Sequence, residues 1–222
     1  TGGVPNEWAS LTKVGRLLLN DNSIEGGLDR SFEHLGMLRE FDISSNPLGV
    51  SLQNLTTPIL MKEAKCKIFN SPPGCIMMER LRASNCDLDG TVPQEIMLAT
   101  EAYSIDISSN RLSGTLPDAV GEIFFTDKVN HYNRFVIVPP AWSSFDIQNN
   151  SDINGTIPKA WGSMNSGRQS NWVLDFRKTG MRASQLPNWL NESETLLSDP
   201  VNNTDCHRII GNGEGGANTQ VL

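Results

Sequence analysis

A short pattern of apolar residues and an asparagine recurs along the chain and constrains its fold more than any other feature. Its clearest copy runs from Ile105 to Pro117, with the sequence IDISSNRLSGTLP. Alternating apolar residues favour a short strand with one buried face, and the asparagine marks the point where the chain leaves that strand. A buried asparagine amide has donors and acceptors for backbone groups of its own turn and of the next turn. The pattern therefore predicts a coil in which these residues stack as a ladder.

The ladder positions divide the chain into turns of a regular length. Successive positions lie 24, 40, 24, 40 and 29 residues apart, so a 24-residue period is interrupted by longer intervals. The two intervals of 40 exceed 24 by 16, which predicts an insertion in each of two turns. The ladder consists of Asn22, Asn46, Cys86, Asn110, Asn150 and Thr179, with cysteine and threonine replacing asparagine once each.

The two insertions, near 51–74 and 121–140, have different character. The first contains Thr-Thr-Pro and Ser-Pro-Pro-Gly around a charged stretch, which predicts an irregular loop with one helical turn. The second has two β-prone runs, Phe124 to Thr126 and Phe135 to Val138, separated by polar residues. That arrangement predicts a hairpin-like flap. Both insertions can carry binding or can be neutral surface additions.

The repeat resembles the leucine-rich repeat, and its Gly-x-[Ile/Val/Leu]-Pro ending resembles the plant-type subfamily of about 24 residues per turn. Pro5-x-x-Trp8, Pro158-x-x-Trp161 and related phrases also resemble the promastigote surface antigens of kinetoplastid parasites. The insertions, the missing cysteine-rich caps and the less uniform repeats depart from those antigens. The resemblance implies an α/β solenoid, a horseshoe with a parallel sheet on the concave side and an irregular or short helical convex side. It covers residues 1–190 and leaves 191–222 as a C-terminal cap or tail.

Composition and charge exclude several functional classes. The net charge of −7 argues against binding a phosphate backbone, so we expect no nucleic-acid partner. No run of 18 apolar residues is present to span a membrane. Catalysis has little support, because Asp residues on one solvated face share the same environment and no Gly-x-Ser-x-Gly turn occurs. We expect no enzyme activity and no cofactor. Residues 1–5 match the second half of a repeat, so we expect more protein on the N-terminal side.

The glycosylation sequons and the cysteines indicate the cellular compartment of the protein. The density of Asn-x-Ser/Thr sequons suggests a secretory pathway, although chance also produces such triplets in a chain of this composition. Cys66 and Cys75 bracket a turn-rich segment and are the favoured disulfide, Cys86 is predicted to be a buried thiol, and Cys206 is left over. A zinc site is disfavoured because no Cys-x-x-Cys occurs and the histidines are scattered. The sequons are at Asn54, Asn149, Asn154, Asn191 and Asn202, of which Asn54 and Asn154 are the better glycan candidates.

The strands supply a candidate binding surface, because residues between the buried apolar pairs point to the concave side. The middle column of this face contains four aspartates and Arg82, which is expected to bridge Asp42 and Asp106. The same aspartates can instead serve solubility and local hydrogen bonds. The candidate partner-binding residues are Asp42, Arg82, Asp106, Asp146 and Asp175.

Two functions remain open from the sequence. The first is an extracellular or cell-surface module that recognises a protein or glycan ligand, including in adhesion. The second is a structural spacer or building block of an extracellular coat or filament, in contact with neighbouring chains. A monomeric domain that captures a soluble ligand would favour the first, and fixed contacts in a repeating assembly would favour the second.

Overall fold

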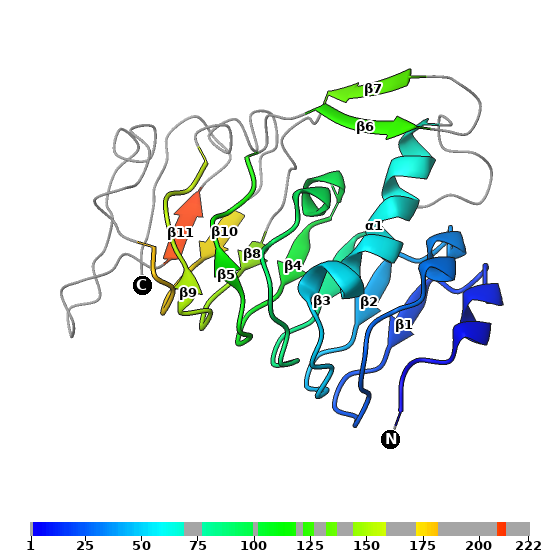
Figure 1. The fold of residues 1–222 in the computed structure, drawn as a ribbon, viewed down its shortest axis with the longest axis horizontal. Helices are drawn as coiled ribbons and strands as arrows, with labels where there is room; N and C mark the ends of the chain where they lie inside the picture. The colour runs from blue at the N-terminus through cyan, green and yellow to red at the C-terminus, as the bar shows by residue number, and fades with distance from the viewer. Residues whose placement is uncertain are drawn as a thin grey trace.

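The computed structural model describes residues 2–68, 77–99, 102–118, 122–126, 132–136, 144–158, 172–181 and 208–211. The chain winds as a coil with one short strand per turn, and the strands stack side by side into a sheet (Figure 1). The sheet order is β1-β2-β3-β4-β8-β10-β11. Its strands are β1 (Arg16–Leu18), β2 (Glu40–Asp42), β3 (Arg80–Arg82), β4 (Ser104–Asp106), β8 (Ser144–Asp146), β10 (Trp172–Asp175) and β11 (Arg208–Gly211).

The first six strands of this sheet pair in parallel, which confirms the predicted solenoid. The observed pairs also confirm the predicted register, for example Phe41 opposite Leu81 and Leu81 opposite Ile105. The last strand, β11, runs antiparallel to β10 and pairs Asp175 with Arg208. β11 lies within the segment 191–222, for which the sequence predicts no strand.

The core is a stack of apolar layers behind the sheet. Each of the six parallel strands contributes a buried apolar side chain, and the position two residues later is buried again in most turns. Because the strand pairs bring these positions into register, burial continues from one turn to the next and no single large core is needed. The buried apolar residues of the six strands are Leu17, Phe41, Leu81, Ile105, Phe145 and Leu174.

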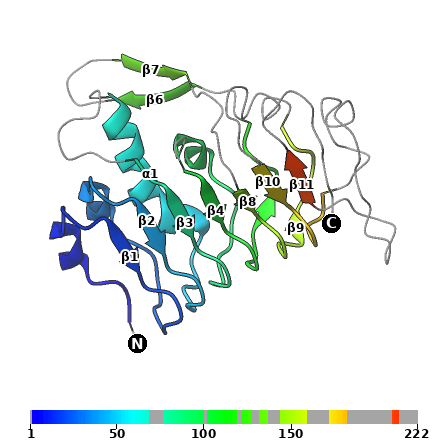
Figure 2. The same ribbon diagram turned by 180° about the vertical axis from the view of Figure 1, so that it is seen from behind.

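Short helices form part of the side of the coil opposite the sheet. The 3₁₀ helices are η1 (Asn6–Ser10), η2 (Arg30–His34) and η3 (Gln94–Leu98). α1 (Leu52–Ile68) packs against η2 and η3, and so occupies the place that a 3₁₀ helix takes in other turns. Figure 2 shows this helix from the side opposite to the view of Figure 1.

The prediction of an irregular loop in the first insertion is wrong over 52–68, where the chain forms α1. Leu52, Leu55, Ile59 and Leu60 are buried and follow a helical spacing, so the first half of the segment belongs to the core. Thr56 Oγ1 donates to Leu52 O at 2.9 Å. Pro58 lies inside the helix, which explains why the Thr-Thr-Pro signal misleads sequence analysis.

The predicted hairpin in the second insertion is confirmed. β6 (Glu122–Thr126) pairs antiparallel with β7 (Tyr132–Val136). The hairpin and the C-terminal end of α1 lie at the same edge of the coil in Figures 1 and 2. The structure thus gives each insertion its own regular element.

The ladder asparagines tie each turn to the one before it. Asn110 Oδ1 accepts from Cys86 N at 2.9 Å and Leu88 N at 3.1 Å, and its Nδ2 donates to Ala83 O at 2.8 Å. Asn46 accepts from Ile24 N at 2.9 Å and donates to Leu19 O at 2.9 Å, both in the preceding turn. Each side chain therefore satisfies backbone groups that the sheet leaves unpaired.

The other ladder positions vary this scheme. Asn150 accepts from Leu112 N at 3.0 Å, whereas the Cys86 thiol donates to Ile43 O and Ser84 O at 3.3 Å each. Thr179 Oγ1 donates to Phe176 O at 2.7 Å, within its own turn. Asn22 is exposed in the first turn and bonds only carbonyls of that turn among the described residues.

Two regularities of the backbone are not evident in the sequence. The residue before every ladder position has a left-handed conformation: Asp21, Ser45, Asn85, Ser109, Asn149 and Lys178, at φ between 54° and 58°. A second strip of parallel pairing also follows the turns, with bridges such as Thr91–Ser113 and the strands β5 (Ser113–Gly114) and β9 (Asp152–Ile153). These paired runs are too short to produce an alternating apolar pattern, so they could not be predicted from the sequence.

Candidate concave-face site

The strand register assembles the predicted middle column. Each pair of neighbouring strands brings its column residues opposite one another, from Leu18 on β1 to Asp175 on β10. Strands lie about 4.8 Å apart, so the column crosses the sheet in steps of that size. In order across the sheet, the column reads Leu18, Asp42, Arg82, Asp106, Asp146 and Asp175.

An arginine cluster surrounds Glu40 at the N-terminal end of this face. Glu40 accepts from Arg16 Nε at 2.7 Å and Arg80 Nη1 at 2.8 Å, and Arg82 lies at 3.8 Å. The bond from Arg80, together with the charge of both close guanidiniums, holds the pKa of Glu40 below its usual range despite the opposing effect of burial. Glu40 therefore remains ionised and holds three arginines that belong to two strands, β1 and β3.

Arg82 makes one of the two predicted bridges. Its guanidinium lies 3.5 Å from the Asp42 carboxylate, as expected, and its second contact is Glu40. The predicted pair between Arg82 and Asp106 is absent, although both residues are described. The reason is that Glu40 and Asp42 on β2 attract this guanidinium toward the N-terminal side.

An exposed aromatic residue adjoins the arginine cluster. The Arg80 guanidinium lies 4.8 Å from the centroid of the Tyr103 ring, a cation–π contact. Arg39 and Glu79 form an ion pair at 3.6 Å in the residues just before β2 and β3. Tyr103 is not among the sequence-predicted site residues. Its position immediately before the β4 repeat motif was the available signal.

Asp106 and Asp146 face the middle of the sheet without an ion pair among the described residues. Asp146 accepts from Gln148 N at 3.0 Å and from Gln148 Nε2 at 3.1 Å. Burial, followed by the charges of Asp106 and Asp175 on the neighbouring strands, raises the pKa of Asp146 to about 6. The middle of the face therefore carries two neighbouring carboxylates that make no ion pair among the described residues.

Asp175 differs from its neighbours in the column. It is buried, and Arg177 donates two hydrogen bonds to its carboxylate, from Nε at 2.9 Å and from Nη2 at 2.7 Å. The same guanidinium donates to Gln148 Oε1 at 3.3 Å, so it bridges β10 and the turn after β8. Asp175 is thus less accessible to a partner than Asp106 or Asp146.

The column aspartates also have a local role. Each accepts a hydrogen bond from the backbone N–H two residues later: Asp42 from Ser44, Asp106 from Ser108, Asp146 from Gln148 and Asp175 from Arg177, at 3.0 to 3.3 Å. Such bonds stabilise the turn that follows a strand. Loss of an aspartate would therefore affect the local backbone as well as the charge of the face.

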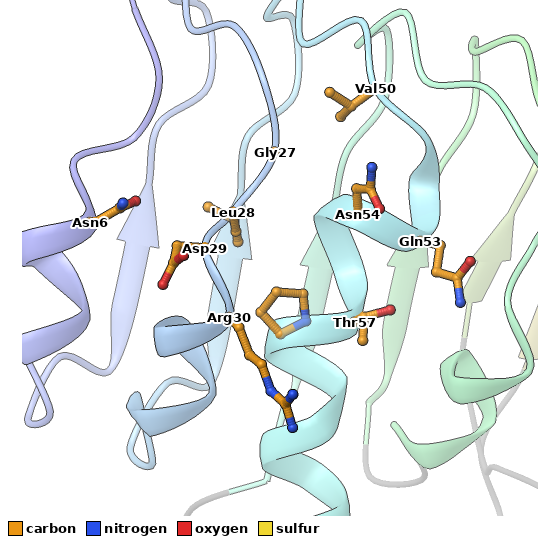
Figure 3. Close-up of a pocket in the computed structure, with 10 residues that line it drawn as sticks. Asn6, Gly27, Leu28, Asp29, Arg30, Val50, Gln53, Asn54 and Thr57 are labelled. Carbon is orange, nitrogen blue, oxygen red and sulfur yellow. The ribbon is translucent and has the colours of Figure 1, made fainter.

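A groove on another side of the coil was not predicted from the sequence. It has a volume of about 730 Å³ and lies between the segment 27–30 and the first turns of α1 (Figure 3). Asn54 lies at this groove, and its exposed side chain is carried by the helix. The other lining residues are Asn6, Gly27, Leu28, Asp29, Arg30, Val50, Gln53, Thr57 and Pro58.

The predicted modification sites are only partly described. Asn154 is exposed in a turn, whereas Asn149 is partly buried and donates to Ser109 Oγ at 3.2 Å. The side chain of Cys66, together with Cys75, Cys206, Asn191 and Asn202, lies outside the described residues. Cys86 is buried, and burial raises the pKa of its thiol to about 11.

The described residues lack two other kinds of site. They contain no group of three or more His, Cys, Asp or Glu side chains placed to hold a metal ion. Within the same part of the chain, no helix has the length and apolar character needed to cross a bilayer.

A repeat of known type is present in the chain. The sequence profile described as Leucine Rich Repeat matches residues 103–123, which contain the clearest copy of the repeated pattern. A search of curated proteins finds no match. The fold, strand register and this match define a leucine-rich-repeat solenoid.

Solved structures share this fold at low sequence identity. A TDR receptor is 20% identical with a TM-score of 0.55, covering 81% of this chain and 25% of the receptor chain. The Arabidopsis receptor kinase HAESA, in complex with the peptide hormone IDA and the co-receptor SERK1, is 21% identical with a TM-score of 0.52, covering 72% and 22%. A plant ice-binding protein is 17% identical with a TM-score of 0.56, covering 82% and 46%. The chain therefore spans less than half the length of these proteins.

Proposed function

We propose that this chain is a non-enzymatic extracellular or cell-surface module whose concave face recognises a protein or glycan ligand. The observation that carries the proposal is the charged surface on the sheet, where ion pairs and the buried ladder hold side chains from successive strands in register. Preorganised side chains lose little entropy on binding and therefore favour specific recognition. The receptor HAESA, with the same fold, was solved with a peptide hormone bound, which supports a protein ligand.

The proposal includes the repeat type and the compartment. The 24-residue spacing and the second strip of parallel pairing support plant-type repeats, and the Pro-x-x-Trp phrases support a resemblance to kinetoplastid promastigote surface antigens. Exposed Asn54 and Asn154 support N-glycosylation, as expected of a secreted or surface protein. A disulfide between Cys66 and Cys75 is part of the same proposal.

Charge-reversal variants test the concave face. The purified domain is screened against secreted-protein and glycan arrays, and hits are compared between the parent, Asp146→Lys and the control Glu7→Lys. Glu7 is exposed in η1, away from the strand columns. Glu7→Lys changes the net charge of the domain by the same amount as Asp146→Lys. We expect a loss of binding of at least tenfold in Asp146→Lys and less than twofold in the control. Equal binding by both variants would refute a concave site.

One observation favours the alternative of a structural building block. Leu11 and Leu18 are 49% and 50% exposed, and Leu18 lies on β1 at the edge of the described sheet. Exposed apolar side chains beside an edge strand can pack against a neighbouring chain. Light scattering distinguishes the roles: a concentration-dependent assembly that Leu11→Glu abolishes supports the building block, and a monomer at all concentrations contradicts it.

A further inference from the structure

The accessible charge on the N-terminal half of the concave face is positive. The side chains of Arg16 and Arg82 are 63% and 36% exposed, whereas those of Glu40 and Asp42 are only 11% and 13% exposed. The carboxylates therefore lie beneath the guanidiniums that they hold. A partner approaching β1 to β3 meets arginine side chains first, although the formal charges nearly balance.

The accessible charge on the next two strands is negative. Asp106 on β4 and Asp146 on β8 lie opposite one another in the register, with no ion pair to either among the described residues. Arg82 on the neighbouring strand β3 pairs instead with Glu40 and Asp42, and Arg177 pairs with Asp175. Burial, followed by the charges of Asp106 and Asp175, raises the pKa of Asp146, which agrees with neighbouring carboxylates that make no ion pair with Asp146.

We propose, resting on the function proposed above, that the ligand is an extended protein segment with an acidic side chain over the guanidiniums of β3 and a basic side chain over Asp106 and Asp146. The guanidiniums of β3 and the middle of the acidic pair are one to two strand spacings apart, or about 5 to 10 Å. An extended chain advances about 3.3 Å per residue, so the basic residue lies about two to three positions from the acidic one. The segment crosses the strands rather than pairing with their edges.

Charge complementarity excludes other occupants of this surface. A neutral glycan offers no cation to Asp106 and Asp146, and a polyanion is repelled by them. A purely basic peptide meets the same repulsion from Arg16 and Arg82. A bipolar segment satisfies both halves at once, and like-charge contacts reject a segment whose charges have the wrong spacing.

A displayed library of random dodecapeptides provides the probe. The parent domain is compared with Arg82→Glu/Asp146→Lys and with the control Arg30→Glu/Glu7→Lys, which changes the same charge types and leaves net charge unaltered. Arg30 and Glu7 lie in η2 and η1, outside the strand columns. We expect parent-selected peptides to carry an acidic and a basic residue two to three positions apart. They should bind at least tenfold more weakly to the concave variant and within twofold to the control.

Other results of the selection would contradict one or both proposals. Selected peptides without this charge pattern that still lose binding in the concave variant overturn the bipolar ligand but keep the concave site. A neutral glycan that binds the face in a parallel array does the same. Loss of binding only in the control moves the site to the groove near Arg30 and refutes both proposals, and so does an absence of any enriched peptide or glycan.

Folding and self-association are controlled separately. If Arg82→Glu/Asp146→Lys fails to fold by circular dichroism, Arg82→Gln/Asp146→Asn is used, which removes the charges without adding like-charge contacts. A dimer of the parent that this variant dissociates would identify a second copy of the chain as the occupant and overturn the peptide assignment.

Discussion

Replacing Asn110 with alanine tests the ladder most directly. Among the described contacts, the side chain is the acceptor for two backbone N–H groups, those of Cys86 at 2.9 Å and Leu88 at 3.1 Å. It also donates to Ala83 O at 2.8 Å. Asn110→Ala leaves these groups in a buried layer without their partner, so we expect a large loss of stability.

The magnitude follows from the number of groups left unpaired. Each buried donor without a partner costs about 1 to 3 kcal/mol, so the two N–H groups account for about 2 to 6 kcal/mol. Asn110 Nδ2 also donates to Ile107 O and Ser108 O, at 3.0 Å each. These carbonyls lose less, because Ile107 O keeps its bond from Asn150 Nδ2 at 3.1 Å and Ser108 O keeps its bond from Asn85 N at 3.1 Å. We expect Asn110→Ala to lower the free energy of unfolding by about 3 to 5 kcal/mol.

Matched variants separate the ladder from the loss of an amide as such. Asn150 serves one N–H, that of Leu112, so Asn150→Ala should cost about 1 to 3 kcal/mol. Asn22 is exposed, and both of its described bonds go to carbonyls of its own turn, so Asn22→Ala should cost less than about 1 kcal/mol. Urea unfolding followed by circular dichroism measures all three. If Asn110→Ala and Asn22→Ala lose equal stability, the ladder argument is wrong.

Three further predictions concern pH, the thiol and the backbone. Because the pKa of Asp146 in the folded state is raised to about 6, the folded state binds this proton more tightly than the unfolded state does, and the free energy of unfolding falls as pH rises from about 4 to 6. After allowing for solvent screening, we expect the free energy of unfolding of Asp146→Asn to exceed that of the parent by about 1 kcal/mol at pH 7. Urea titrations should show that this advantage is lost below pH 4. The Cys86 thiol should resist alkylation in the folded protein and react on unfolding, as peptide mass spectrometry would show, and rapid native labelling would contradict its burial. Gly155→Ala should destabilise more than Gly26→Ala in thermal melts, because both have positive φ but only the new Cβ at 155 meets Thr115 Cγ2, at 2.9 Å; equal losses would contradict this packing argument.

The solenoid and its register could be predicted from the sequence because they depend on a repeated buried pattern. Phe41, Leu81 and Ile105 occupy equivalent positions in their copies, and a one-residue slip would expose each of them. The hairpin was predictable for a similar reason, since its two β-prone runs flank a polar segment. The antiparallel strand β11 was not, because it repeats no part of the pattern.

The side-chain geometry of the concave face was only partly predictable. The columns follow from the register, but the choice of Arg82 between Asp42 and Asp106 depends on Glu40, which lies in an adjacent column. The helix α1 was missed because Pro58 and the neighbouring threonines suggest a break, whereas tertiary burial of Leu52 and Leu55 stabilises the helix. The competing signals were local, and the deciding contacts came from other turns.

The two roles of the column aspartates explain how a structural position can also serve recognition. One oxygen of Asp106 accepts from Ser108 N at 3.0 Å, and one of Asp146 accepts from Gln148 N at 3.0 Å, so both carboxylates are fixed by their own turns. Their charge is not neutralised by these neutral donors, unlike that of Asp175, which Arg177 clasps. A charge that is already positioned needs no rearrangement to meet a cation. The turn that stabilises the solenoid therefore also orients the anionic half of the proposed ligand surface.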